Sequence, residues 1–293
     1  MLRLRRLAAH LPAAPVLAAE AKIESNAAPA DAARGPLAGV VVLDLTQMVS
    51  GPMGTQILGD QGADIIKIEN TTSGAAERGG ARSTVGTPLS AQINRNKRSL
   101  SLDLKAPEGV KILKRLAARA DCLVQNFRPG VIDRMGLGYD TLSKLNPGLI
   151  FVSISGFGQS GPYSQKRVYD PVIQSVSGLA SIQADENDRP RMMRLIVPDK
   201  VTALTSAQAI AAALVQKYRT GEGAHIELAM LDATLQFAWG EGMARYGFVD
   251  DPDSTEALET VEHEYVRDMV FKTSDGYITG NFHDICLQPT KQS

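Results

Sequence analysis

Residues 191–218 read RMMRLIVPDKVTALTSAQAIAAALVQKY and join a short apolar run to a long helical pattern. From Val201 onward, apolar residues recur every three or four positions in an Ala-rich context, which predicts a buried helix of four or more turns. The run Leu195-Ile196-Val197 before it is short and β-branched, which predicts an extended segment. Pro198 and Asp199 mark the junction between the two patterns.

Asp199 at this junction has two interpretations. As an N-cap, its carboxylate would accept hydrogen bonds from the first free amides of the helix. As a functional group, it would be oriented and partly desolvated between two apolar runs, which is the setting of a nucleophilic or general-base aspartate. In either case we expect the helix amides to keep the carboxylate ionised. Asp170, beside a glycine-rich loop, is the alternative candidate.

Before this stretch, strand patterns alternate with helix patterns from Pro36 onward. The apolar runs lack polar alternation, so the strands are covered on both faces. The sequence therefore predicts an α/β fold with a doubly wound, mostly parallel Rossmann-like sheet. Ligands of such sheets lie beyond the carboxyl ends of the strands. The predicted strands are 39–45, 64–69, 99–104, 121–126 and 149–155, with helices at 51–62, 106–119, 131–135 and 139–145.

After the long helix, the patterns predict an edge strand at 224–228, a helix from 231 to about 246, an acidic loop at 250–264 and a hairpin of 268–272 with 277–279. We therefore expect three parts. Residues 1–35 form a targeting peptide or disordered linker, residues 36–223 a large α/β domain, and residues 224–293 a linker helix with the beginning of a second, smaller α+β domain.

The N-terminal residues carry Arg3, Arg5 and Arg6 and no acid over the first nineteen positions, followed by a Pro/Ala-rich segment. This composition is typical of a mitochondrial transit peptide. The alternative is a disordered extension of a bacterial protein, which would leave the chain in the cytoplasm.

The overall composition narrows the class of function. A chain of 293 residues, 44% hydrophobic and 22% charged, can bury a core. Its net charge of −1 and pI near 6.4 argue against nucleic-acid and membrane-surface partners. No run of eighteen apolar residues would span a membrane. Two cysteines and four scattered histidines predict neither a disulfide framework nor a metal site.

One basic loop precedes a predicted strand. A second basic loop and a glycine-rich loop each follow a predicted strand. Residues 94–98, NRNKR, and 126–130, NFRPG, with Arg134 in the next turn, favour a polyphosphate or nucleotide ligand. For the first loop, a solvated edge is the alternative. Residues 156–161 match G-x-G-x-x-G, but no amphipathic helix begins after them. We expect this loop to shape a ligand cleft.

These motifs fall in the order found in the family III CoA-transferases, and the chain resembles that family from about residue 36 to 279. The matching blocks are LDLT (43–46), GP (51–52), IKIE (66–69), NRNKRS (94–99), NFRPG (126–130), MGLGY (135–139), GFGQSGP (156–162), YDP (169–171), PD (198–199) and TGEG (220–223).

The resemblance implies a catalytic aspartate at Asp199. It also implies that residues 36–223 bind coenzyme A (CoA) as a substrate, with no metal. The predicted CoA-binding set is Gln47, Lys97, Arg98, Asn126, Arg134, Met135, Arg167 and Tyr169.

Some positions depart from related families. Gln47 and Val49 replace the His and Gln of formyl-CoA transferases, and Asn70 replaces a CoA-binding Arg, so formyl or oxalate specificity is not expected. The α-methylacyl-CoA racemases have a His where this chain has Tyr169. Because this chain lacks that second proton carrier, a racemase is the weaker, alternative function.

The resemblance further implies transfer of CoA from an acyl-CoA donor to a small carboxylic acid through an aspartyl-CoA thioester. Family members interlock as homodimers and build the large domain from both ends of the chain. This chain lacks the returning C-terminal segment, so an inactive, truncated member is a further alternative.

Overall fold

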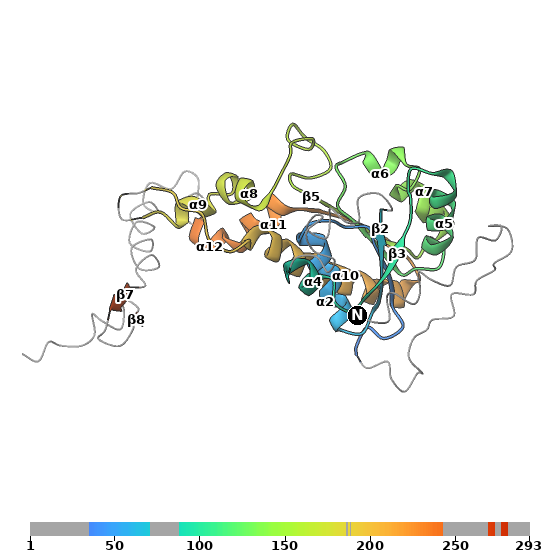
Figure 1. Ribbon diagram of the computed structural model, residues 1–293, viewed down its shortest axis with the longest axis horizontal. Helices are drawn as coiled ribbons and strands as arrows, with labels where there is room; N and C mark the ends of the chain where they lie inside the picture. The colour runs from blue at the N-terminus through green and yellow to red at the C-terminus, as the bar shows by residue number, and fades with distance from the viewer. Residues whose placement is uncertain are drawn as a thin grey trace, which may run out of the picture. The chain divides into compact units, whose positions relative to one another are not determined.

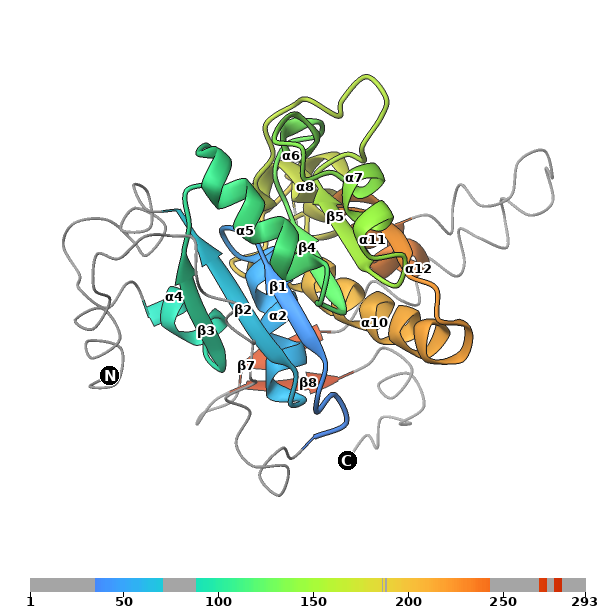
Figure 2. The same ribbon diagram turned by 90° about the vertical axis from the view of Figure 1, so that its right-hand side faces the viewer.

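The computed structural model describes residues 35–70, 88–185, 187, 189–242, 269–272 and 277–280. Six strands form one sheet in the order β3-β2-β1-β4-β5-β6, and each neighbouring pair is parallel (Figures 1 and 2). The predicted doubly wound α/β fold is confirmed. The strands are β1 (Val41–Asp44), β2 (Asp64–Glu69), β3 (Lys97–Ser101), β4 (Cys122–Gln125), β5 (Ile150–Ser155) and β6 (Ala224–Ala229).

Helices cover both faces of this sheet (Figure 2). One buried cluster packs α2 (Ser50–Asp60) and α10 (Val197–Thr220) against strand residues such as Val42. The other packs α5 (Pro107–Ala117), α6 (Val131–Arg134) and α7 (Tyr139–Leu145) against residues such as Leu43. Successive side chains of a strand face opposite sides, so uninterrupted apolar runs serve both clusters.

The remaining described elements are shorter. Helix α4 precedes β3, helices α8 and α9 lie between β5 and α10, and helices α11 and α12 follow β6. Their bounds are α4 (Pro88–Ile93), α8 (Asp170–Val176), α9 (Leu179–Ile182), α11 (Met230–Phe237) and α12 (Trp239–Gly242), with a hairpin of β7 (Met269–Lys272) and β8 (Tyr277–Gly280). The hairpin is antiparallel, as predicted.

The start of α10 differs from the prediction. Val197 is the first residue of the helix and Ile196 its N-cap, so residues 195–197 do not form an extended strand. Proline suits the first turn because the amide it lacks would have no partner there. Asp199 is therefore the third residue of the helix and not its N-cap, and the N-cap interpretation is wrong.

The sheet also extends past the predicted domain boundary after Gly223. Strand β6 pairs with β5 from Ala224 to Ala229 and forms the edge of the sheet. The predicted edge strand is confirmed, but it belongs to the large domain. Residues 1–34 and 250–264, for which a targeting peptide and an acidic loop were predicted, lie outside the described residues. None of the described helices is long and apolar enough to cross a membrane.

Candidate active site

Asp199 lies where the N-terminal ends of three helices meet. Its carboxylate has Ser50, the first residue of α2, as a neighbour. Its own backbone N–H donates to Oδ2 of Asp170, the first residue of α8, over 3.2 Å. Asp170 is buried, and its Oδ1 accepts from Gln174 Nε2 at 2.5 Å.

This environment raises the pKa of Asp199 to about 6. Burial is the main cause, and the neighbouring charge of Asp170 adds to it, while the hydrogen bonds from Ser50 oppose both. The helix amides were expected to keep this carboxylate ionised, and burial and Asp170 act against that effect by raising the pKa. The carboxylate is still mainly ionised at neutral pH, and it is partly desolvated, as a nucleophile requires.

A groove follows the carboxyl edge of the sheet, on the side of α5 and α6. Its inner part is lined by residues at or just after the ends of four strands, and its outer part, of about 600 Å³, lies between α5 and α6. Leu104, Lys105 and Met135 line both parts, so the two are continuous. The strand order reverses at β1 and β4, which is where a doubly wound sheet binds its ligand.

The charged side chains that line the outer part of the groove are cations. They are Lys105, Lys111, Lys114 and Arg134. Together with the apolar surface of Val110 and Met135, they form a site suited to a polyphosphate attached to an apolar group. The three lysines were missed in the sequence because they lie in and before a helix, where lysine is ordinary. The spacing of Lys111 and Lys114 on α5, with Lys105 just before that helix, was the available signal.

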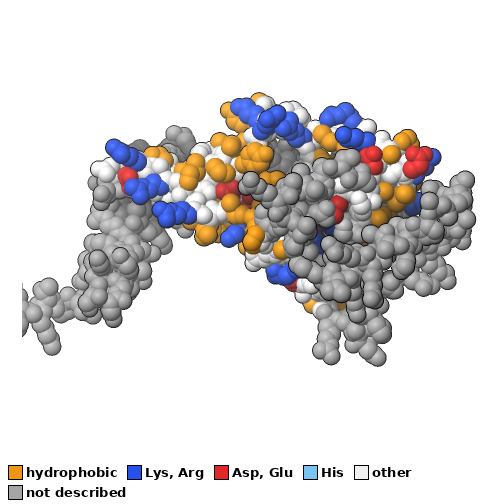
Figure 3. All heavy atoms as spheres, in the orientation of Figure 1, with side chains coloured by type: hydrophobic (Ala, Val, Ile, Leu, Met, Phe, Trp, Pro, Cys, Tyr) orange, Lys and Arg blue, Asp and Glu red, His pale blue; other side chains and the backbone are white. Residues whose placement is uncertain are grey.

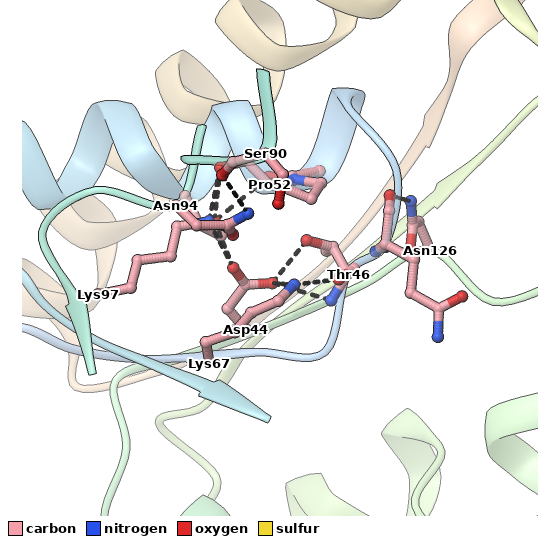
Figure 4. Close-up of polar contacts among 11 residues, drawn as sticks. Asp44, Thr46, Pro52, Lys67, Ser90, Asn94, Lys97 and Asn126 are labelled. Atoms are coloured by element: carbon pink, nitrogen blue, oxygen red, sulfur yellow. Dashed lines mark hydrogen bonds and ion pairs between the residues drawn. The ribbon is translucent and has the colours of Figure 1, made fainter. Parts of the chain in front are cut away.

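Two predicted residues are joined across the strand reversal. The backbone N–H of Gln47 donates to Asn126 Oδ1 and Asn126 Nδ2 donates to the Gln47 carbonyl, both over 2.8 Å (Figure 4). Gln47 lines the inner groove. The structure thus brings together Gln47, Asn126, Arg134 and Met135 of the predicted set.

Asp44 anchors this region from inside the sheet. The carboxylate is fully buried and accepts hydrogen bonds from the backbone N–H and the hydroxyl of Thr46. It also forms ion pairs with Lys67 and Lys97 (Figure 4). Burial raises the pKa of the Asp44 carboxyl, but the two lysines and the hydrogen bonds outweigh it and hold the pKa well below its usual range. Lys67 also donates to the Thr46 carbonyl. The network fixes the chain just before Gln47.

Lys97 and Arg98 do not contribute to the groove, in contrast to the prediction. Lys97 Nζ is buried and donates to Asp44 Oδ2 at 2.8 Å and to the Pro52 carbonyl at 2.7 Å. Burial lowers its pKa to about 8, although Asp44 opposes the shift. Arg98 pairs with Asp64, the first residue of β2, at the edge opposite the groove. Both side chains are thus paired with aspartates away from the groove, and their predicted phosphate contact stays a prediction.

Arg167 and Tyr169 line neither part of the groove. Both are exposed, and Tyr169 is the N-cap of α8, directly before Asp170. Gly156 of the glycine-rich loop lies against Val168, which ties this loop to the same segment. Figure 3 shows Lys and Arg side chains along the upper edge of the molecule, over the loop after β5 and over α6. Tyr169 therefore directly precedes Asp170, which contacts Asp199.

Asp199 and the groove flank one loop, residues 45–49, with Gln47 on the groove side and Ser50 at the aspartate. Among the described side chains, no three His, Cys, Asp or Glu are grouped closely enough to hold a metal ion. The arrangement can bind a phosphorylated ligand beside a partly desolvated carboxylate.

Comparisons with known proteins point to one family. The model of "CoA-transferase family III" matches residues 37–283. Human succinyl-CoA:glutarate CoA-transferase is 40% identical over 245 residues, which are 83% of this chain and 55% of that protein. Succinate–glutarate CoA-transferase of Agrobacterium fabrum is 42% identical over 67% of this chain and 51% of its own length. The chain therefore spans about half the length of these relatives.

A solved structure gives the same result for the fold. The crystal structure of a CAIB/BAIF family protein from Brucella suis superposes with a TM-score of 0.70 and 32% identity, over 83% of this chain and 65% of that one.

Proposed function

The chain belongs to CoA-transferase family III, and from this we propose that it moves CoA from an acyl-CoA donor to a small carboxylic acid through an aspartyl-CoA thioester on Asp199. The observation that carries the proposal is a partly desolvated carboxylate at a helix start whose backbone N–H donates to Asp170, together with a cationic groove at the strand reversal.

In the proposed reaction, the Asp199 carboxylate attacks the thioester carbonyl carbon of the donor. The C–S bond breaks, the CoA thiolate leaves, and Asp199 becomes part of a mixed anhydride. The thiolate then attacks the aspartyl carbonyl, which releases the donor acid and leaves a thioester on Asp199. The acceptor carboxylate takes the CoA by the same steps in reverse, which regenerates the aspartate. Backbone amides of the glycine-rich loop are candidates to stabilise the oxyanions.

We propose that the groove holds the nucleotide end of CoA. Lys105, Lys111, Lys114 and Arg134 would hold the phosphates, and Met135 would contact the apolar part. Gln47, which lines the inner part of the groove, and Asn126, which is hydrogen-bonded to it, would direct the pantetheine arm. Succinyl-CoA and glutarate are the first substrates to test, because the names of two relatives contain these acids.

Trapping the covalent intermediate tests the function directly. The wild-type protein incubated with succinyl-CoA should give a hydroxylamine-sensitive adduct on the peptide that contains Asp199, and Asp199→Asn should give none. Asp170→Asn is the matched control, since it removes a buried neighbouring carboxylate and leaves the nucleophile. An adduct that persists in Asp199→Asn and disappears in Asp170→Asn would move the nucleophile to Asp170.

We also propose that the chain acts as a homodimer and is directed to mitochondria. The dimer is supported by exposed apolar side chains on α8, among them Tyr169 and Val176. The location is supported by Arg3, Arg5 and Arg6 in an acid-free segment. A fluorescent fusion of residues 1–34 should reach mitochondria in a eukaryotic host, and a cytosolic signal would contradict the targeting.

A further inference from the structure

Two polar side chains at the carboxyl end of β5 have buried atoms without a hydrogen-bond partner among the described residues. They are Ser155, the last residue of β5, and Gln159, in the glycine-rich loop that follows. Ser155 is only 9% exposed, and the unpaired atoms are its Oγ and the Nε2 of Gln159. Burying a polar group without a partner costs free energy, so each such group in a folded protein is a candidate for a ligand contact.

Ser155 lies on the face of the sheet that carries the groove. Side chains alternate along a strand, so Ser155 shares its face with Ser153 and Phe151. Phe151 belongs to the buried cluster that also contains residues of α5, α6 and α7. The groove follows this face, and Phe127, in the loop after the neighbouring strand β4, lines it. The unpaired hydroxyl is therefore at the next strand end along the edge where a doubly wound sheet binds its ligand.

The loop after β5 is fixed by contacts at its start and in its middle. The Gly156 carbonyl accepts the backbone N–H of Leu231 at 3.1 Å, and a Cβ on Gly156 would lie 2.4 Å from Val168 Cγ1. Further along, the rings of Phe157 and Tyr163 meet edge to face, with 5.7 Å between their centroids. The loop is therefore held in place without a ligand, and its unpaired groups are preorganised to receive one.

The two unpaired groups require the same kind of partner. The amide nitrogen of Gln159 only donates hydrogen bonds, and the Ser155 hydroxyl can rotate to donate one as well. A carbonyl or carboxylate oxygen accepts from both. The loop that carries them leads to Asp170, whose Oδ2 accepts the backbone N–H of Asp199 at 3.2 Å. In the proposed reaction, the acyl group, the acid and the pantetheine arm all have such oxygens.

We propose that Ser155 and Gln159 form a substrate-binding site for a carbonyl or carboxylate oxygen at the end of β5. The inference rests on the proposed function for the source of that oxygen, which is the acyl group or the pantetheine arm of an acyl-CoA. The unpaired state of the Ser155 hydroxyl is a property of the fold and can be measured without turnover.

Urea unfolding of Ser155→Ala and Ser153→Ala tests the unpaired hydroxyl. Ser153 is the matched control, because it lies on the same face of β5 and is 3% exposed, but its Oγ accepts from Gln125 Nε2 at 3.0 Å and is 3.1 Å from His225 Nε2. Ser153→Ala should lower the urea midpoint, since it leaves buried partners unpaired. Ser155→Ala should leave the midpoint unchanged or raise it, since no hydrogen bond is lost. An equal fall in both variants would show that the Ser155 hydroxyl is satisfied without substrate and would overturn the inference.

Substrate binding is measured in the Asp199→Asn background, in which we expect no transfer. Calorimetric titration with CoA and with succinyl-CoA separates the two sources of the oxygen. Adding Ser155→Ala, or Gln159→Met, which keeps the volume without the donor, should weaken binding about tenfold through the lost hydrogen bond. Ser153→Ala should leave both Kd values unchanged.

The pattern of the loss identifies the bound oxygen. A loss confined to succinyl-CoA would place the acyl group at this site, and an equal loss for both ligands would place the pantetheine arm there. Unchanged Kd values for both ligands in both variants would overturn the inference. If the wild type binds CoA but transfers none from succinyl-CoA to glutarate, the proposed function fails, and the unfolding and binding tests still decide the site. If Ser155→Ala does not fold, Gln159→Met carries the binding test.

Discussion

At the scale of single residues, burial in the folded protein disfavours the ionised form of the Asp199 carboxylate. The carboxyl titrates near 3.8 in an unfolded chain and near 6 in the folded protein. Between these values the folded state holds a proton that the unfolded state has lost, so stability decreases as pH rises from about 4 to about 6. Catalytic carboxylates commonly carry such a cost.

Asp199→Asn should therefore gain stability relative to the wild type as pH rises. Because Asn does not titrate, the difference in unfolding free energy should change in favour of the variant by up to about 3 kcal/mol between pH 4 and pH 7. Urea unfolding at a series of pH values measures it. A difference that stays constant over this range would show that the pKa of Asp199 is not raised.

Arg134 provides a test of the groove. Arg134→Ala should weaken CoA binding by about 1.5–3 kcal/mol, as expected for a hydrogen bond to a charged group. Arg98→Ala removes the same side chain at the opposite edge of the sheet, where it pairs with Asp64, and should leave the Kd of CoA unchanged. Calorimetric titration of CoA into both variants gives the answer. Equal weakening by the two would indicate a general charge effect and not a site.

Asp199 could be identified from the sequence because a strand-like run and a helix pattern meet there. Its hydrogen bond with Asp170 could not, because that contact joins residues far apart in the chain. For Lys97 the sequence was misleading. Its basic neighbours have the composition of a phosphate site, but composition does not reveal that Lys97 is paired with the buried Asp44 in the folded protein.

At the scale of elements, the helices α2 and α10 approach closely through Gly54. A Cβ on Gly54 would lie 2.3 Å from Ser206 Oγ and 3.2 Å from the Ala203 carbonyl oxygen. Gly54→Ala should destabilise the protein by about 1–3 kcal/mol through overpacking. Adding Ser206→Ala removes the nearest atom, so the double variant should be more stable than the sum of the single effects. Thermal unfolding of the four proteins tests this, and strict additivity would contradict the close approach.

The Asp44 network joins β1, β2, β3 and α2, and its loss should be costly. Asp44→Asn leaves Lys67 and Lys97 without their buried counter-charge, so we expect a loss of about 3–5 kcal/mol in urea unfolding. Asp64→Asn breaks a more exposed pair with Arg98 and should cost at most about 1 kcal/mol. Similar small losses in both variants would show that the buried network contributes little.

Elements with a clear apolar period were predicted most closely. The bounds of β2 and α7 agree with the prediction residue for residue. Strand β3 was placed two residues late because it begins with Lys97 and Arg98, whose charges are paired with Asp44 and Asp64 only in the folded sheet. The start of α10 was missed because Val197 favours strands locally, while packing of the helix overrides that preference.

At the scale of the whole molecule, the described surface carries an apolar stripe along α8. Val172 and Val176 are 38% and 50% exposed and lie four residues apart, so they share one side of the helix, and Tyr169, its N-cap, is 63% exposed. Helix α11, in contact with α8, ends in the exposed Phe237. Apolar side chains gathered in this way are typical of protein interfaces.

We expect a second copy of the chain to cover this stripe. In size-exclusion chromatography with light scattering, the protein should have the mass of a dimer, and Val176→Lys should shift it to the monomer because a charge would be buried without a partner. Val215→Lys is the matched control, because Val215 is 58% exposed on α10, outside the stripe. A dimer broken by Val215→Lys and kept by Val176→Lys would move the interface to α10. A monomer at all concentrations would exclude the dimer, and the aspartate would then have to act within a single chain.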